Sequence, residues 1–388
     1  MEIPRHLLAA ARDRLLPGKV LLLMGARRTG KTTLSRHLQA SWPGSSLSLN
    51  GDDLSVQQAL ASRSEKNLQA LVGDATLLVL DEAQTVPDVG AILKLLVDTQ
   101  PNLAVLATGS SSFDLGRRTG EPLTGRSQRL TLYPLAQCEL APMESSIQTS
   151  NLLGTRLVYG GYPEIVTAPS EQQQRELLLE LVNAYLFKDI LQYDGLRRAD
   201  KLARLLQLLA MQIGRQVSLE ELGRQLGLGR NTVERYLDLL EQCFVVMRLG
   251  GFSRNLRKEI SKTSRWYFVD NGVRNALIRN FNPPPLRDDV GALWENYLML
   301  ERMKRLEYER RFANRWFWRT HDRQEIDLVE EEGGQLSGWE FKWGKPGHER
   351  APRAWQDAYP GAGYRVIHPQ DYLEFITIPG GFDSPGPD

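Results

Sequence analysis

The chain has 388 residues, of which 41% are hydrophobic and 24% charged, and its 48 Lys and Arg residues nearly balance its 47 Asp and Glu residues. This length allows two or three domains, and the near-zero net charge means that any affinity for nucleic acid must come from local basic patches. The two cysteines, Cys138 and Cys243, form no metal or disulfide pattern, which argues against a disulfide-rich secreted fold. The N-terminus lacks a signal-peptide layout and no apolar run is long enough for a membrane helix. We therefore expect a cytoplasmic protein with no membrane contact.

The first predicted strand, residues 20–24, leads into the sequence Gly25-Ala-Arg-Arg-Thr-Gly-Lys-Thr32, which matches the phosphate-binding pattern GxxxxGK[ST]. A helix pattern follows, so backbone N–H groups and the helix N-terminus would converge on phosphate oxygens. We expect ATP with Mg²⁺ here, with Lys31 on the β- and γ-phosphates and the Thr32 hydroxyl on Mg²⁺. The other expected nucleotide contacts come from the same loop: Gly25, Arg27, Arg28, Thr29, Gly30 and Thr33.

The next two predicted strands each end in side chains suited to nucleotide chemistry. Asp81 and Glu82 come after the apolar run 77–80, where Asp81 would orient the Mg²⁺ water shell and Glu82 would polarise the attacking water. The run 103–107 ends at Thr108 and Ser110, whose hydroxyls are candidates for sensing the γ-phosphate, with ordinary turn chemistry as the alternative.

Four arginines come next: Arg117, Arg118, Arg126 and Arg129. An arginine that reaches a neighbouring subunit stabilises transition-state charge on the γ-phosphate. Arg126 is our first candidate for this catalytic role and Arg118 the second, with a structural or solvated role as the alternative for each. Such an arginine, called an arginine finger, acts only between subunits, so its presence would predict a homo-oligomer.

These motifs resemble an AAA-type ATPase over residues 1 to about 150. The resemblance is carried by Gly25–Thr32, Leu77–Gln84 and Thr108-Gly-Ser-Ser. Tyr133-Pro-Leu and Gly160-Gly-Tyr-Pro-Glu164 are also similar to a bacterial and archaeal subgroup with a C-terminal restriction-nuclease-like domain. The resemblance implies ATP hydrolysis and paired or ring assembly, a hexamer being one candidate, and it leaves the substrate open.

Residues 151–200 have a helical pattern and are expected to connect and pack. Within residues 201–282, Ser218-Leu-Glu-Glu221 is a capping box, Gly227-Leu-Gly229 interrupts the helix, and a second helix is expected from Asn231 to about Glu241. Strand patterns at 244–249 and 266–269 follow, so this segment looks like a winged helix.

The winged-helix pattern favours DNA contact. The candidate contacts are basic residues of the second helix and the wing: Arg230, Arg235, Arg254, Arg257, Lys258 and Lys262. The alternative is a domain that only packs or oligomerises, since Glu234, Asp238 and Glu241 acidify the second helix.

A proline-rich linker, Pro283-Pro-Pro285, begins the last predicted domain, residues 283–380, and a tail follows over 381–388. A helix from Val290 carries Glu295, and later strands carry Asp327 and the pair Glu340 and Lys342. This order resembles the PD-(D/E)XK nuclease superfamily. Side chains two apart on a strand share a face, so Glu340 and Lys342 would point the same way, and a hairpin would bring Asp327 beside Glu340. These two carboxylates would hold Mg²⁺, and Lys342 would position a catalytic water. The resemblance implies that Glu295 completes the metal site.

The chain is therefore expected to be an α/β protein with three parts: a parallel-sheet ATPase domain, a helical and winged-helix middle, and a restriction-nuclease-like end. A basic stretch, residues 302–323, interleaves aromatic residues and favours nucleic acid, with core packing as the alternative for the aromatics. The expected function is ATP-driven remodelling or processing of branched or single-stranded DNA, such as junction branch migration or metal-dependent cleavage. The alternative is a nucleotide-controlled protein-binding switch with an inactive nuclease-like domain.

Overall fold

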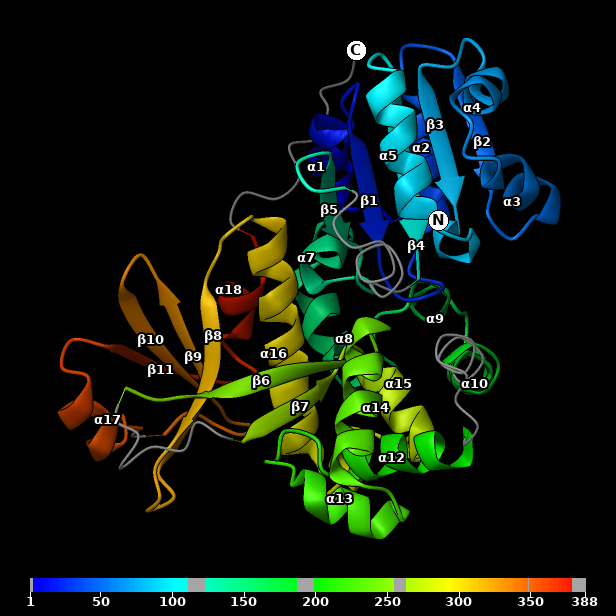
Figure 1. Ribbon diagram of the computed structural model, residues 1–388. Coiled ribbons are helices and arrows are strands. Elements are labelled where there is room, and N and C mark those ends of the chain that lie inside the picture. Colours follow the sequence, from blue (N-terminus) through cyan, green and yellow to red (C-terminus); the bar gives the residue numbers. More distant parts are fainter. Residues whose placement is uncertain (1–2, 111–122, 187–198, 255–262, 348, 379–388) are drawn as a thin grey trace. The chain divides into compact units, whose positions relative to one another are not determined.

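The computed structural model describes residues 3–110, 123–186, 199–254, 263–347 and 349–378 (Figure 1). It divides into two compact units. Unit 1 is residues 1–134 with 242–244, and unit 2 is residues 135–241 with 245–388. The first unit therefore ends at Pro134, before the boundary expected near residue 150. The backbone N–H of Leu135 already donates to the carbonyl of Gly161 in unit 2, 2.7 Å away.

Unit 1 is built on a five-stranded parallel sheet in the order β2-β3-β4-β1-β5. Its strands are β1 (Val20–Met24), β2 (Ser46–Asn50), β3 (Leu77–Asp81), β4 (Ala104–Gly109) and β5 (Ser127–Thr131). Its helices are α1 (Leu7–Arg14), α2 (Lys31–Ala40), α3 (Leu54–Ala61), α4 (Glu65–Val72), the short 3₁₀ helix η1 (Ala83–Thr85) and α5 (Val89–Thr99). Every side chain of β1 and β4 is buried, as expected for central parallel strands covered on both faces.

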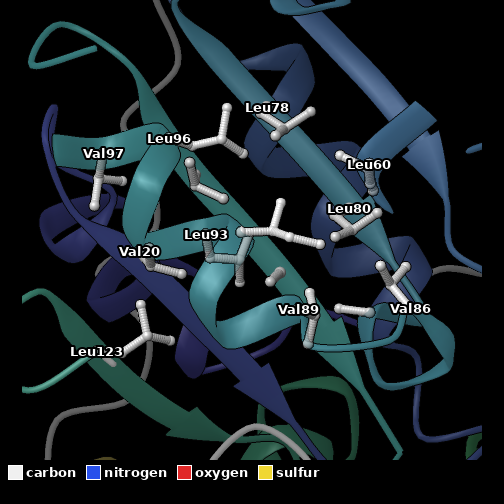
Figure 2. Packing of buried hydrophobic residues seen from close by; sticks show 14 of the residues in the cluster. Val20, Leu60, Leu78, Leu80, Val86, Val89, Leu93, Leu96, Val97 and Leu123 are labelled. Atoms are coloured by element: carbon white, nitrogen blue, oxygen red, sulfur yellow. The ribbon is translucent and has the colours of Figure 1, made fainter. Parts of the chain in front are cut away.

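The core of unit 1 explains why these strands were visible in the sequence. Val20, Leu78 and Leu80 from the sheet pack with Leu93 and Leu96 of α5, and all five side chains are completely buried (Figure 2). Continuous apolar runs therefore become strands whose carboxyl ends share one edge of the sheet, which is where α/β proteins place ligands.

Unit 2 begins with helices. These are α7 (Gln137–Leu140), the 3₁₀ helix η2 (Ala141–Met143), α8 (Ser146–Tyr159), α9 (Pro163–Val166), α10 (Glu171–Glu180) and a π-helix, η3 (Leu181–Leu186). After the undescribed segment come α12 (Ala199–Met211), α13 (Leu219–Leu226), α14 (Arg230–Gln242) and α15 (Asn271–Leu277). Gly227 has a φ of 63° and ends α13, so the predicted glycine turn is present, while α14 starts one residue before the expected Asn231.

The second sheet has six strands in the order β11-β10-β9-β8-β6-β7. They are β6 (Val246–Phe252), β7 (Ser264–Phe268), β8 (Asn314–Arg319), β9 (Glu325–Glu332), β10 (Gln335–Phe341) and β11 (Gly363–Ile367). The accompanying helices are η4 (Pro284–Leu286), α16 (Val290–Tyr308), α17 (Arg353–Ala358) and α18 (Tyr372–Ile376). Because β6 pairs with both β7 and β8, the expected wing hairpin and the expected C-terminal domain share one sheet.

None of the helices in the described ranges combines the length and apolar character needed to cross a lipid bilayer.

Candidate functional site

The phosphate loop of unit 1 lies between β1 and α2, as the sequence predicts. The Lys31 side chain is buried, and its Nζ donates to the carbonyl oxygens of Gly25 and Ala26, both 2.9 Å away. Gly25 has a φ of 153°, and a Cβ there would lie 2.2 Å from the carbonyl oxygen of Leu132. The close approach of backbone to backbone therefore requires glycine at this position.

The remaining predicted loop contacts share this turn. Thr29 is buried and donates to the carbonyl of Ala26, while Gly30 has a φ of 98° directly before α2. Arg27 and Arg28 are half-buried in the loop, and Thr33 is exposed on the first turn of α2. The loop backbone and the N-terminus of α2 thus present N–H groups at one place.

The two predicted magnesium residues of unit 1 meet at the sheet edge. The Thr32 hydroxyl donates to Asp81 Oδ2 at 2.9 Å, and the Thr108 hydroxyl donates to Asp81 Oδ1. Hydroxyl and carboxylate oxygens are the ligands that Mg²⁺ prefers, so this donor set fits the ion. The structure thus brings together β3, β4 and the phosphate loop.

The Glu82 side chain is held by a neighbour, Gln84, that sequence reasoning did not give a role in positioning it. The Glu82 backbone has a φ of 48°, a left-handed conformation that is uncommon outside glycine and occurs at functional sites. The buried Gln84 amide donates to Glu82 Oε2 and to the Ser110 hydroxyl, the latter at 3.1 Å. Gln84 therefore joins the expected catalytic carboxylate to an expected sensor. The sequence signal that could have identified Gln84 is its position in the Asp-Glu-Ala-Gln motif, two residues after Glu82.

Arg5 is a second residue that sequence reasoning missed. One guanidinium nitrogen donates to the carbonyl of Thr29 in the phosphate loop, and another donates to the carbonyl of Tyr133, both at 2.6 Å. The N-terminal segment therefore ties the loop to the last residues of unit 1. Nothing in the sequence around Arg5 signals this contact, because its partners are backbone atoms far along the chain.

The predicted arginine finger lies away from the phosphate loop of its own chain. Arg126 precedes β5 at the edge where Val20 begins β1, whereas the loop follows Met24 at the opposite end. Its side chain is 41% exposed and pairs with Asp98. A finger acts on a neighbouring chain, so its role stays a prediction, and Arg117 and Arg118 lie outside the described residues.

The basic residues expected to contact DNA are partly neutralised. Arg230 is exposed and pairs with Glu220 at 3.2 Å, and Arg254 is exposed and pairs with Glu331 at 2.6 Å. Arg235 is exposed on α14. The remaining three candidates, Arg257, Lys258 and Lys262, lie outside the described residues.

A cavity of about 200 Å³ lies between the α13–α14 pair and the β6–β7 hairpin. Its lining carries the acids Glu220, Glu234 and Asp238 beside Arg230 and Arg248. The acidic residues Glu234 and Asp238 noted in the sequence thus face the same hollow as Arg230.

Four acids at the expected nuclease site gather in unit 2 and are called here the carboxylate cluster: Glu295, Glu325, Asp327 and Glu340. Arg265 of β7, a cation that sequence reasoning missed, pairs with three of these acids. Its guanidinium donates to Glu295 Oε1 at 3.3 Å, to Asp327 Oδ1 at 3.2 Å and to Glu325 Oε2 at 2.9 Å. The strand pattern placed Arg265 beside the wing, but only the shared sheet brings it to these acids.

The predicted catalytic lysine pairs with its own neighbour. Lys342 Nζ donates to Glu340 Oε1 at 2.7 Å, as expected for residues two apart at the end of a strand. Among the residues that the structure describes, no three His, Cys, Asp or Glu side chains are arranged to hold a metal ion. With Arg265 already among the acids, the set of Glu295, Asp327 and Glu340 does not fit the predicted Mg²⁺.

Burial raises the pKa values of Glu295, Asp327 and Glu340. Desolvation, followed by repulsion from Asp327, raises the pKa of Glu295 to about 8, although Arg265 opposes the shift. Desolvation and the same repulsion raise the pKa of Glu340 to about 7. The acids thus compete for limited positive charge in a poorly solvated site.

The first part of the basic stretch 302–323 is internal, contrary to the nucleic-acid interpretation there, whereas Arg310 and Arg323 are exposed. Arg302 is buried and forms two hydrogen bonds with Glu330, at 2.9 and 2.7 Å, and buried Lys304 pairs with Glu301 at 2.6 Å. Phe317 and Trp318 are completely buried, while Phe312 is 88% exposed. At these buried positions, the charged and aromatic residues serve the packing of α16 and β8.

Three family models match successive parts of the chain. Residues 17–141 match the AAA domain. Residues 150–283 match a domain of unknown function (DUF8612), and residues 290–376 match another (DUF4143). The first match covers the phosphate loop and the polar ends of β3 and β4.

Relatives in other organisms match most of the chain. The uncharacterized proteins Rv2008c of Mycobacterium tuberculosis and Mb2031c of Mycobacterium bovis are each 30% identical over 339 residues, 86% of this chain and 73% of theirs. The uncharacterized protein MJ1544 of Methanocaldococcus jannaschii is 24% identical over 79% of this chain and 72% of its own. The RuvB Holliday junction branch migration motor of Thermotoga maritima matches 62% of this chain and 85% of its own, with 21% identity and a TM-score of 0.30, too low to support an argument.

Proposed function

This chain belongs to the family that includes Rv2008c of Mycobacterium tuberculosis, and we propose that it is an ATP-driven switch whose second unit binds DNA. Unit 1 is an AAA-type ATPase domain. The observation that carries the proposal is the meeting of Thr32, Asp81, Thr108 and Glu82 at the carboxyl edge of the parallel sheet.

The residues at this edge of the sheet have separate roles in hydrolysis. The phosphate loop and Lys31 bind and orient the β- and γ-phosphates, while Thr32 and Asp81 would hold Mg²⁺, which neutralises phosphate charge when bound. Glu82 orients the attacking water and accepts its proton, and Gln84 fixes the direction of the Glu82 carboxylate. Thr108 supports both acids, because its hydroxyl donates to Asp81 and accepts the backbone N–H of Glu82 at 3.2 Å.

The DNA part of the proposal rests on the architecture of α12 to β7. Three helices are followed by an antiparallel hairpin, and Gln216 pairs with Arg265 as a short additional strand contact. This order of elements supports the winged-helix interpretation, in which the helix after the turn and the hairpin would contact DNA. The exposed Arg230 and Arg235 of α14 and Arg254 after β6 are the proposed phosphate contacts.

Cleavage is not part of the proposal, because the carboxylate cluster does not fit a divalent cation. ATP would instead change how unit 2 engages DNA, as in remodelling of branched or single-stranded DNA by a homo-oligomer. The C-terminal elements follow the order α16-β8-β9-β10-α17-β11. This order is compatible with a nuclease-like fold, and such a fold would favour nucleic acid as the ligand of this part of the chain.

The experiment measures ATP turnover, DNA binding and DNA cleavage together, with duplex, single-stranded and four-way-junction DNA in Mg²⁺. We expect Lys31→Ala to abolish ATP turnover and to keep DNA binding. Replacing Arg230 and Arg254 together by Ala should weaken DNA binding and lower the salt dependence of the affinity. A wild-type protein without measurable DNA affinity at low salt would refute the DNA part and leave the ATPase part standing.

A second candidate is a nucleotide-controlled protein-binding switch, and the cavity beside α14 favours it. Glu220, Glu234 and Asp238 around this hollow would repel phosphate and attract a basic peptide. An ATPase rate that no DNA changes, together with no DNA binding, would favour this candidate over the first.

A further inference from the structure

The carboxylate cluster of unit 2 contains a cation supplied by the protein itself. We propose that the Arg265 guanidinium takes the place of a metal ion in this cluster, so that the cluster fastens β7 to α16 and β9 and binds no divalent metal. The inference does not depend on DNA binding.

Charge and burial are the first support. The Arg265 side chain is 5% exposed and donates to one acid of α16, Glu295, and to two of β9, Glu325 and Asp327. Its guanidinium also lies over the Phe317 ring, 4.8 Å from the centroid. A planar guanidinium with several donors suits converging carboxylates, and a buried cation of this kind is expensive to unpair.

The acceptor atoms that a metal would need are the second support. Asp327 Oδ1 accepts from Arg265, and its Oδ2 accepts from the backbone N–H of Phe341 at 3.0 Å. Glu295 Oε1 accepts from Arg265 and also from the Tyr267 hydroxyl at 2.7 Å. At these three oxygens a hard cation would compete with N–H and O–H donors, one of them a backbone group at the end of β10.

The fourth acid is compensated separately. Glu340 Oε1 accepts from Lys342, whose side chain is 53% exposed. Lys342 is thus engaged at the edge of the cluster, while Arg265 occupies the interior beside Asp327 and Glu295. Because a guanidinium cannot acidify a bound water as a metal ion does, this arrangement does not generate the nucleophile of metal-dependent phosphodiester cleavage.

The position of Arg265 gives the cluster a structural consequence. Arg265 follows the first residue of β7, and α16 packs against this strand (Figure 1). The ion pairs therefore hold the returning strand of the β6–β7 hairpin against the helix that opens the DUF4143 match.

The test is Mn²⁺ binding to the full-length, nucleotide-free protein, followed by electron paramagnetic resonance. We expect wild type to bind no Mn²⁺ at the cluster and Arg265→Met to gain one site. That site should be lost again when Asp327→Asn is added. Arg248→Met is the matched control, because Arg248 lies on the same hairpin and donates to Ser264 instead of to the cluster.

Two results would overturn the proposal. One is a Mn²⁺ site in wild type that Asp327→Asn removes, and the other is a folded Arg265→Met protein that still binds no Mn²⁺. ATP turnover measured on the same samples reports separately on unit 1.

Thermal unfolding keeps the proposal testable if Arg265→Met is too unstable to titrate. We then expect Asp327→Asn in the same chain to recover much of the lost melting temperature, because it removes an uncompensated buried charge. Glu325→Gln should recover less, since the Glu325 side chain is 43% exposed. Failure of Asp327→Asn to recover any stability would contradict the proposed charge compensation.

Discussion

Among single residues, the proposed catalytic carboxylate of unit 1, Glu82, is positioned by a side chain outside the phosphate-binding motif. Gln84 contributes one amide that reaches both Glu82 and Ser110. A glutamate that must orient water needs a fixed direction, and this amide supplies it. The left-handed backbone at Glu82 has the same effect, because it turns the chain sharply after β3.

We predict that Gln84→Ala lowers kcat for ATP roughly tenfold with little change in KM, since it misdirects Glu82 without touching the phosphate loop. Glu82→Gln should lower kcat by about 10²- to 10⁴-fold, as expected for loss of a general base. Steady-state ATPase kinetics would check both. A Gln84→Ala enzyme with the wild-type kcat would show that the hydrogen bond to Glu82 has no catalytic role.

A second prediction for a single residue concerns Asp289. Burial raises the pKa of this carboxyl, but hydrogen bonds from Arg287 and Arg274 outweigh it and lower the pKa from 3.8 to about 2. A lowered folded-state pKa gives stability that is present above about pH 4 and lost as the pH falls towards about 2. The shift corresponds to roughly 2 kcal/mol of unfolding free energy at neutral pH.

We therefore expect Asp289→Asn to lose about 2 kcal/mol at about pH 7 and to show a weaker loss of stability than wild type between about pH 4 and 2. Urea unfolding at several pH values measures both. Asp288→Asn is the control, because Asp288 is exposed beside it. An equal effect of the two substitutions at neutral pH would contradict the role assigned to the arginine pair.

Among the helices and strands, the Gly160-Gly161 pair joins the end of α8 to the start of α15. Gly160 ends α8 with a φ of 75°, and Asp270 accepts the backbone N–H of Gly161 at 2.7 Å and that of Val273 at 3.0 Å. Asp270 thereby caps α15 and holds the turn after α8 at once. The glycines of the Gly160-Gly-Tyr-Pro-Glu164 motif thus allow the backbone after α8 to lie close to Asp270.

We predict that Gly160→Ala destabilises unit 2 by at least about 2 kcal/mol, because a Cβ would lie 2.1 Å from Asp270 Oδ1 and the φ is unfavourable for alanine. Gly154→Ala in the same helix should be neutral or stabilising by up to about 1 kcal/mol, since its nearest neighbour is Pro284 at 3.6 Å. Denaturant unfolding compares the two. Equal stability of both variants would contradict this account.

For the molecule as a whole, ATP hydrolysis is expected to need a second copy. Arg126 lies at the edge of its own sheet opposite the phosphate loop, so a catalytic role would have to be at the site of a neighbour. We predict that Arg126→Ala lowers kcat roughly 10³-fold. Mixing it with Lys31→Ala should restore part of the activity, because one interface then holds both an intact loop and an intact finger.

ATPase assays of the single variants and of the mixture make this measurement. Arg129→Ala, an exposed arginine on β5, is the control and should retain activity. If Arg126→Ala alone hydrolyses ATP at the wild-type rate, the finger must be another residue.

The features of this protein that could be predicted from the sequence are the local ones. The phosphate loop, Asp81 with Glu82, and the apolar strands before them could be located because each is a short contiguous pattern with its own backbone requirement. The AAA match over residues 17–141 confirms the ATPase domain. The turn between α13 and α14 was visible for the same reason, since its capping residues and glycine lie within a few positions.

The contacts between residues that lie far apart in the sequence could be identified only from the folded chain. Arg265 lies 62 residues from Asp327, and nothing near Arg265 in the sequence indicates that β6 joins the sheet of β8. Arg302 and Lys304 looked like part of a basic surface because sequence shows charge but not burial, and ion pairs such as Arg302 with Glu330 form across elements. Ion pairs and sheet neighbours depend on distance in space, which a one-dimensional pattern does not contain.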